Sequence, residues 1–129
     1  MRYLEARTAT LSLLPDMPGW TVYGDGVADG AHPPWIVVSF TETGRDHTES
    51  LAATTHHGRL AVRVVGEGET GVNIACERLQ SALDGGMPEG MSALVPDLDS
   101  GAYPAELQQP GSSRPYVIRV LTWHTGWPA

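Results

Sequence analysis

The fold of this chain is decided by the stretch Leu60-Ala61-Val62-Arg63-Val64-Val65, the acidic turn at 66–69 and the segment 71–84. The first six residues are apolar apart from Arg63, which favours a strand inside a sheet. In the segment that follows, apolar residues recur at i, i+3, i+4, i+7, i+10 and i+11, the pattern of an amphipathic helix. The sequence therefore predicts a strand that leads into a helix covering the sheet.

The predicted helix carries one apolar stripe, formed by Val72, Ala75, Cys76, Leu79, Ala82 and Leu83. Burying this stripe contributes about 6–10 kcal/mol before the cost of ordering the chain. Thr70 is the expected N-terminal cap, and Gly85 with Gly86 is the expected end. The segment is therefore the predicted main cover of the sheet.

Two further strands are expected at 34–40 and 116–124, because both are rich in apolar and β-branched residues. A weaker alternation at 50–57, with Gly58 as a turn, predicts a hairpin with the strand 60–65. Shorter elements are expected as well: a helix over 2–14 and strands over 20–23, 93–95 and 103–107.

The segments 24–30, 41–46 and 109–113 lack periodicity and are rich in Gly, Pro, Ser or charged residues, which predicts loops. The fold class that follows is α+β, in a single domain spanning 1–129. We expect a small, mostly antiparallel mixed sheet, packed by one main helix (about 71–84) and a short N-terminal helix, with long loops.

The formal net charge is −7, with 15 acidic and 8 basic residues, and every basic residue is Arg. The positive charge expected of a nucleic-acid binder is therefore missing. The single cysteine excludes an internal disulfide. No apolar run reaches the length of about 20 residues that crosses a membrane. We expect a soluble protein inside the cell.

No catalytic, cofactor-binding or metal-binding residue is predicted. His56 and His57 are neighbours, and neighbours on a strand point to opposite faces, so they cannot easily share an ion. Cys76 lies on the apolar helix stripe, which favours a small buried side chain over a reactive thiol. The sequence has no nucleophile elbow, phosphate-binding loop or dinucleotide fingerprint. We therefore expect a protein that is not an enzyme.

Three residues are candidates for contacts with other subunits. Arg63 and Arg119 interrupt apolar strands. Each lies either at a solvent-facing position with its aliphatic stem on the sheet, or in an intersubunit ion pair. Trp127 follows the last predicted strand, and it docks either on its own domain or on a neighbour.

The order of the segments is informative in itself. After the N-terminal helix and a Gly/Pro-rich approach, the chain runs through Pro34-Trp35-Ile36-Val37-Val38-Ser39-Phe40, Gly44-Arg45, Glu49-Ser50-Leu51-Ala52, Leu60-Ala61-Val62-Arg63-Val64-Val65-Gly66, the helix Ala75 to Gly85 and a last strand. This order resembles the tail terminator (tail completion) proteins of long-tailed bacteriophages, especially those that infect GC-rich actinobacteria.

The resemblance implies a structural virion protein. Members of this family form a hexameric ring that caps the tail tube, stops its polymerisation and joins the tail to the head connector. The implied partners are further copies of the chain, the major tail tube protein and the head–tail stopper or connector. Six copies would carry a charge of roughly −42, which suits a conduit for genomic DNA that passes without specific binding.

Under this interpretation the loops are the working surfaces. The loop 25–34, with Asp25 and Asp29, and the loop 41–49, with Arg45, are expected to reach a neighbouring subunit or the tube. The segment 85–114 is expected to line the lumen or to contact the connector.

Two alternatives stay open. A head–tail stopper is the alternative within the virion, although stoppers are usually richer in β-structure and the strong helix at 71–84 favours a terminator. Outside the virion, the alternative is a small intracellular ligand-binding domain or enzyme. That function requires a pocket with clustered titratable groups, and the sequence contains no recognisable cluster.

Overall fold

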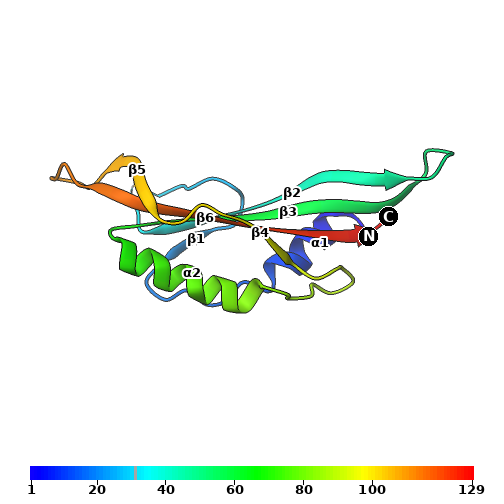
Figure 1. Ribbon diagram of the computed structural model, residues 1–129, viewed down its shortest axis with the longest axis horizontal. Helices are drawn as coiled ribbons and strands as arrows, with labels where there is room; N and C mark the ends of the chain where they lie inside the picture. The colour runs from blue at the N-terminus through cyan, green and yellow to red at the C-terminus, as the bar shows by residue number, and fades with distance from the viewer. Residues whose placement is uncertain (31) are drawn as a thin grey trace.

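The computed structural model describes residues 1–30 and 32–129 and has an α+β fold, with a mixed six-stranded sheet and two helices on one of its faces (Figure 1). Ala31, which belongs to the predicted loop 25–34, lies outside the described residues. The elements are α1 Tyr3–Leu11, β1 Thr21–Tyr23, β2 Trp35–His47, β3 Ala53–Gly66, α2 Glu69–Leu83, β4 Val95–Asp99, β5 Tyr103–Gln108 and β6 Pro115–Pro128.

The sheet is built around three long strands. Its order is β1-β2-β3-β6-β4, and β5 also pairs with β6. The pair β1–β2 is parallel, and the pairs β2–β3, β3–β6, β4–β6 and β5–β6 are antiparallel. The mostly antiparallel mixed sheet agrees with the prediction. Because β3 pairs with a long strand on each side, it forms the centre of the molecule.

The core lies between the central strands and the helices. Val62 lies in register between Val38 and Leu121, and all three are at most 2% exposed. Rows of this kind repeat along the strands, because alternate residues point to one face of the sheet. The core is completed from α1 by Ala6 and from α2 by its apolar side.

Helix α2 is the predicted helix with slightly different bounds. Five of its six predicted stripe positions are buried: Val72, Ala75, Cys76, Leu79 and Leu83. The predicted cap at Thr70 was wrong, because the helix begins earlier and Gly68 is the cap, with its carbonyl accepting from Val72 N at 3.2 Å. Gly85 follows the helix with φ of 72°, in the left-handed region that favours glycine, as expected at a helix end.

The region 41–58 differs from the prediction. Strand β2 continues to His47 and β3 begins at Ala53, so 41–46 is strand instead of loop and the turn lies at 48–52. Gly58 is not a turn, because it lies inside β3 opposite Glu42. The prediction failed because backbone pairing holds these polar strands together, and such pairing leaves no apolar periodicity in the sequence.

Strand β6 also runs past its predicted end at 124 and finishes at Pro128, so Trp127 lies within the strand rather than beyond it. Its indole packs across Gly58. A Cβ at Gly58 would lie 2.6 Å from Cζ3 of Trp127 and 3.2 Å from Cζ of Phe40. The glycine that suggested a turn is therefore a site of close ring-on-backbone packing.

Gly58→Ala is expected to lower the free energy of unfolding by about 1–3 kcal/mol, because the added methyl group overlaps the Trp127 ring. Chemical denaturation followed by tryptophan fluorescence measures this change. Gly44→Ala is the matched control, since Gly44 is in the same hairpin and its added Cβ would meet nothing within 4 Å. Equal stabilities of the two variants would contradict the packing described for Trp127.

Leu79→Asp is expected to unfold the protein, because Leu79 is 1% exposed in the seam between α2 and the sheet. Placing a carboxylate there costs about 4 kcal/mol or more, a large share of the stability of a small domain. Thermal melting followed by circular dichroism tests this. Ser81→Asp, on the exposed side of the same helix, should melt close to the unmodified chain. A retained cooperative melt in Leu79→Asp would show that the orientation of α2 is wrong.

Candidate interaction surfaces

The β2–β3 arm, residues 41–58, extends beyond the helix-covered core at one end of the molecule (Figure 1). Every residue from Thr41 to Ala52 is exposed. Two side-chain pairs cross the arm: His56 Nδ1 lies 2.5 Å from Glu42 Oε1, and His57 Nε2 lies 3.0 Å from Asp46 Oδ2. The arm is therefore a paired projection, with register shifts between Glu42 and Gly44 and between Asp46 and His47, and its surface is available to a partner.

The tip of this arm exposes an apolar side chain. Thr48 N donates to Ala52 O at 2.9 Å, and Leu51 N donates to Thr48 O at 2.9 Å. Leu51 has φ of 65° and its side chain is 79% exposed. A leucine is uncommon in the left-handed region, and exposure of its side chain gives the arm no stability. The arrangement makes Leu51 a candidate contact point.

The β5–β6 arm, residues 103–118, extends from the opposite end of the molecule (Figure 1). Gln109 Nε2 donates to Glu67 O at 3.1 Å and to Pro115 O at 3.3 Å, which attaches the arm to the turn after β3. Tyr103 and Leu107 are 44% and 45% exposed. This arm also offers a partly apolar surface that the chain itself does not cover.

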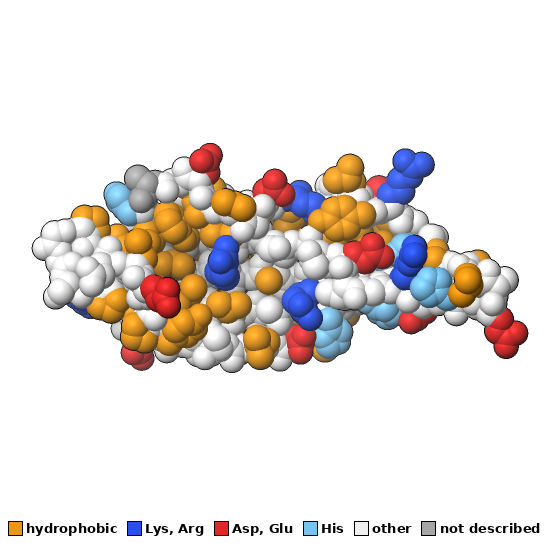
Figure 2. Space-filling model, turned by 90° about the horizontal axis from the view of Figure 1, so that it is seen from above, with side chains coloured by type: hydrophobic (Ala, Val, Ile, Leu, Met, Phe, Trp, Pro, Cys, Tyr) orange, Lys and Arg blue, Asp and Glu red, His pale blue; other side chains and the backbone are white. Residues whose placement is uncertain are grey.

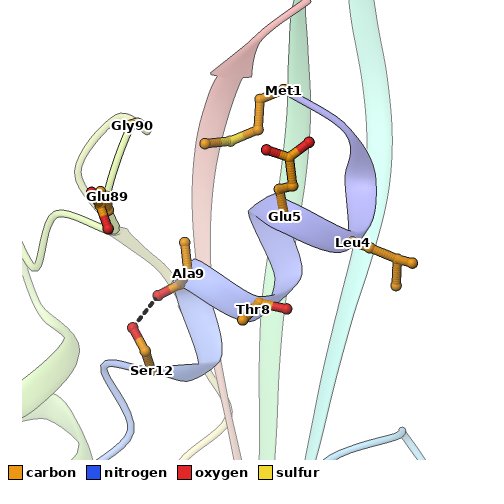
Figure 3. A pocket seen from close by; sticks show the side chains of 8 residues that line it. All are labelled: Met1, Leu4, Glu5, Thr8, Ala9, Ser12, Glu89 and Gly90. Carbon is orange, nitrogen blue, oxygen red and sulfur yellow. Dashed lines mark hydrogen bonds between the residues drawn. The ribbon is translucent and has the colours of Figure 1, made fainter.

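A groove of about 750 Å³ lies between α1 and the loop at 89–90 (Figure 3). Its lining residues are Met1, Leu4, Glu5, Thr8, Ala9, Ser12, Glu89 and Gly90. The two carboxylates come from opposite sides of the groove, and the hydroxyl of Ser12 donates to Ala9 O at 2.6 Å. The ionisable side chains that line the groove are therefore two carboxylates, those of Glu5 and Glu89.

A second cavity, of about 280 Å³, lies on the face of the sheet opposite the helices. We call it the outer-face hollow. Its lining residues are Ala28, Trp35, Val37, Arg63, Val65, Ala105, Glu106, Leu107 and Ile118. Its floor consists of Trp35, Val65 and Ile118, which lie opposite one another on β2, β3 and β6. Its walls come from the loop after β1 and from β5. Figure 2 shows hydrophobic side chains gathered over this half of the face, with arginines beside them.

The two strand arginines have different environments. Arg63 is exposed and donates from Nη2 to Gly26 O at 3.2 Å, which agrees with the solvent-facing interpretation. Arg119 agrees with neither interpretation, since it forms an ion pair within the chain. Its Nη2 and Nε lie 2.6 Å and 3.0 Å from the carboxylate oxygens of Asp99. Its Nη1 donates to Asn73 Oδ1 at 3.0 Å, so Arg119 links β6 to α2.

This ion pair changes the titration of both partners. The hydrogen bonds from Arg119 hold the pKa of Asp99 below its ordinary value of 3.8. The same bonds raise the pKa of the Arg119 guanidinium. Because both groups keep some contact with water, the pair is worth less than a buried one.

Trp127 docks on its own domain, which decides between the two sequence-based interpretations. Its side chain is 2% exposed. Its ring centroid lies 5.6 Å from that of Phe40 and 5.4 Å from that of His56, on which it stacks. It therefore anchors the root of the β2–β3 arm to β6.

The other predicted contact residues are exposed and are not brought together. Asp25 and Asp29 lie in the loop after β1, whereas Arg45 lies on the β2–β3 arm opposite His56. Asp25 Oδ1 lies 3.7 Å from Arg7 Nη2, a contact that solvent weakens because Asp25 is fully exposed. These residues remain candidates for partner contacts.

Cys76 is buried on the helix stripe, as predicted. Burial raises the pKa of its thiol to about 11. The thiol therefore stays protonated near neutral pH and is a poor nucleophile.

Sequence reasoning missed Ile74, which is 64% exposed on α2. The helical periodicity could have found it, because it is the apolar residue that lies off the buried stripe. The outer-face hollow had no comparable signal, since its walls come from segments far apart in the sequence.

Within residues 1–30 and 32–129, no group of three or more His, Cys, Asp or Glu side chains is placed to hold a metal ion. Over the same residues, no helix has the length and apolar character needed to cross a membrane. Comparison with known protein families and with curated protein sequences finds no match.

Asp99→Asn is expected to lower the free energy of unfolding by about 0.5–1 kcal/mol near pH 7, because Arg119 loses its charged partner. The pKa of Asp99 is lowered on folding, so its contribution is complete above about pH 4 and is lost as pH falls through the folded pKa. The difference between the two chains should therefore shrink below about pH 4.

Urea denaturation across this pH range measures the difference in stability. Asp97→Asn, on the same strand, is the matched control and should show no such pH-dependent difference. A difference for Asp99→Asn that grows on acidification would contradict the ion pair.

Proposed function

We propose that this chain is the tail terminator of a long-tailed bacteriophage. In this proposal it forms a hexameric ring at the head-proximal end of the tail tube, stops tube polymerisation and joins the tail to the head connector. The observation that carries the proposal is the pair of exposed β arms, 41–58 and 103–118, at opposite ends of a small helix-covered core (Figure 1).

The arms support an assembly role because their strands extend past the part of the sheet that the helices cover. Strands beyond the helix-covered core bury little apolar area, so they contribute little stability to the isolated chain. An exposed Leu51 at one tip, and Tyr103 and Leu107 on the other arm, suit contacts with partners. The partners in this proposal are neighbouring copies, the major tail tube protein and the stopper or connector.

The charge supports the same role. The chain carries a net charge of −7, and a ring multiplies this value. A ring of this sign repels the phosphate backbone, so genomic DNA passes through the lumen without binding to it. The assembled protein belongs to the virion, at the neck of the tail.

The groove beside α1 is the feature that favours the ligand-binding alternative (Figure 3). It is open, and its ionisable lining side chains are two carboxylates. Binding sites for small molecules usually combine enclosure with several converging polar groups. The arms therefore support the structural role better than the groove supports a ligand-binding one.

The proposal is tested on phage particles that encode this chain. Immuno-electron microscopy with antibodies against it should label the junction of head and tail. Particles assembled without the chain should give tails of irregular length and heads without tails, and adding the purified chain should restore joining. Antibody label on the connector side of the junction, combined with tails of normal length in particles assembled without the chain, would favour a stopper. Absence of the chain from purified particles would overturn the proposal.

A further inference from the structure

The outer-face hollow has a rim of two opposite charges. Arg63 and Glu106 both line it, and both residues are exposed. Neither forms an ion pair among the described residues. The interior is apolar, with Trp35, Val65 and Ile118 as its floor. An apolar cavity of about 150 Å³ already accommodates a benzene-sized group, so the 280 Å³ of this hollow can accommodate a branched aliphatic side chain.

The exposed side of α2 has the complementary pattern. Ile74 is 64% exposed there, at the centre of a ridge that continues through residues three and four positions away. Glu77 and Arg78 follow it on the same ridge, both exposed and both without an ion pair among the described residues. The ridge thus offers one apolar side chain with a negative and a positive group beside it.

We infer that the α2 ridge of one copy docks into the outer-face hollow of the next, with Ile74 in the hollow, Glu77 on Arg63 and Arg78 on Glu106. The occupant is a second copy of this chain because the ridge supplies an apolar side chain for the hollow and one charge of each sign for its rim. This inference rests on the proposed ring and adds the contact that would build it.

The topology requires the contact to lie between copies. Helix α2 covers one face of the sheet and the hollow lies on the other, so a ridge cannot reach the hollow of its own chain (Figures 1 and 2). Two different patches meet in such a contact, which makes it heterologous. Heterologous contacts propagate from copy to copy and close into a ring when the rotation between copies allows.

The test is disulfide trapping in the full chain with Ala28→Cys and Ile74→Cys together. Ala28 lines the hollow and Ile74 is on the ridge, so a bond between them joins two copies head to tail. Mild oxidation with oxidised glutathione is expected to give a ladder of dimers, trimers and larger species. Cys76 does not compete, since it is buried and its thiol pKa is about 11. Ala52→Cys with Ile74→Cys is the control and should give no ladder.

Charge exchange tests the pairing without cysteines. Arg63→Glu is expected to raise the concentration at which copies associate at least tenfold in sedimentation analysis, and adding Glu77→Arg to that chain should reverse the loss. Ile74→Asp should have a similar effect, whereas Met87→Asp, at a site of similar exposure (69% against 64%) beyond the end of α2, should not. The Ile74→Asp and Arg63→Glu chains, each with one intact surface, should form dimers when mixed and nothing larger.

The outcomes separate this inference from the proposed function. A chain that forms rings but gives no ladder, and whose rings survive Ile74→Asp, overturns the ridge–hollow contact and leaves the terminator role in place. A chain that stays monomeric at all concentrations also overturns the contact. The terminator role is then judged separately, on labelling and tail length in particles.

Discussion

The pairing of β3 with β2 on one side and β6 on the other is the constraint on which the rest of the structure depends. It fixes the register in which Val62 lies between Val38 and Leu121, and it sets the apolar face that the helices cover. The three strands have 13, 14 and 14 residues and extend further than the 15-residue helix α2, because a strand rises about 3.3 Å per residue and a helix about 1.5 Å. Their ends therefore continue past the covered region, and the arms are a direct consequence of strand length (Figure 1).

Sequence reasoning found the parts of the fold in which burial and periodicity coincide. The helix α2 and the inner parts of β2, β3 and β6 were predicted because one side of each is apolar at a regular spacing. The arm at 41–58 was missed because it is polar and its stability comes from backbone pairing. Gly58 was misread for a related reason, since its role depends on a ring 69 positions along the chain, Trp127.

The candidate surfaces were less predictable than the fold. Arg119 was identified as an interruption in a strand, yet its partner Asp99 is on a neighbouring strand whose bounds were not known, so the ion pair within the chain was missed. For Trp127 the sequence left two docking sites open, and the structure packs its ring on its own domain, inside β6 and away from any partner surface. The outer-face hollow depends on loop and strand placement that no local pattern encodes. The helical pattern alone places Ile74 off the apolar stripe. Its exposure suggests a contact only once the structure shows an apolar hollow on the opposite face of the sheet.

The two faces of the sheet differ in what they present to a neighbouring copy. One face is covered by helices whose outer side carries Ile74 beside Glu77 and Arg78, and the other carries a hollow bounded by opposite charges. A chain with a single self-complementary face would form symmetric pairs and stop there. Different faces favour repeated head-to-tail contacts, and each contact can be weak because closure of a ring makes the last one intramolecular. The same asymmetry leaves the β2–β3 arm outside the contact, where it can reach a different partner, whereas the β5–β6 arm supplies one wall of the hollow.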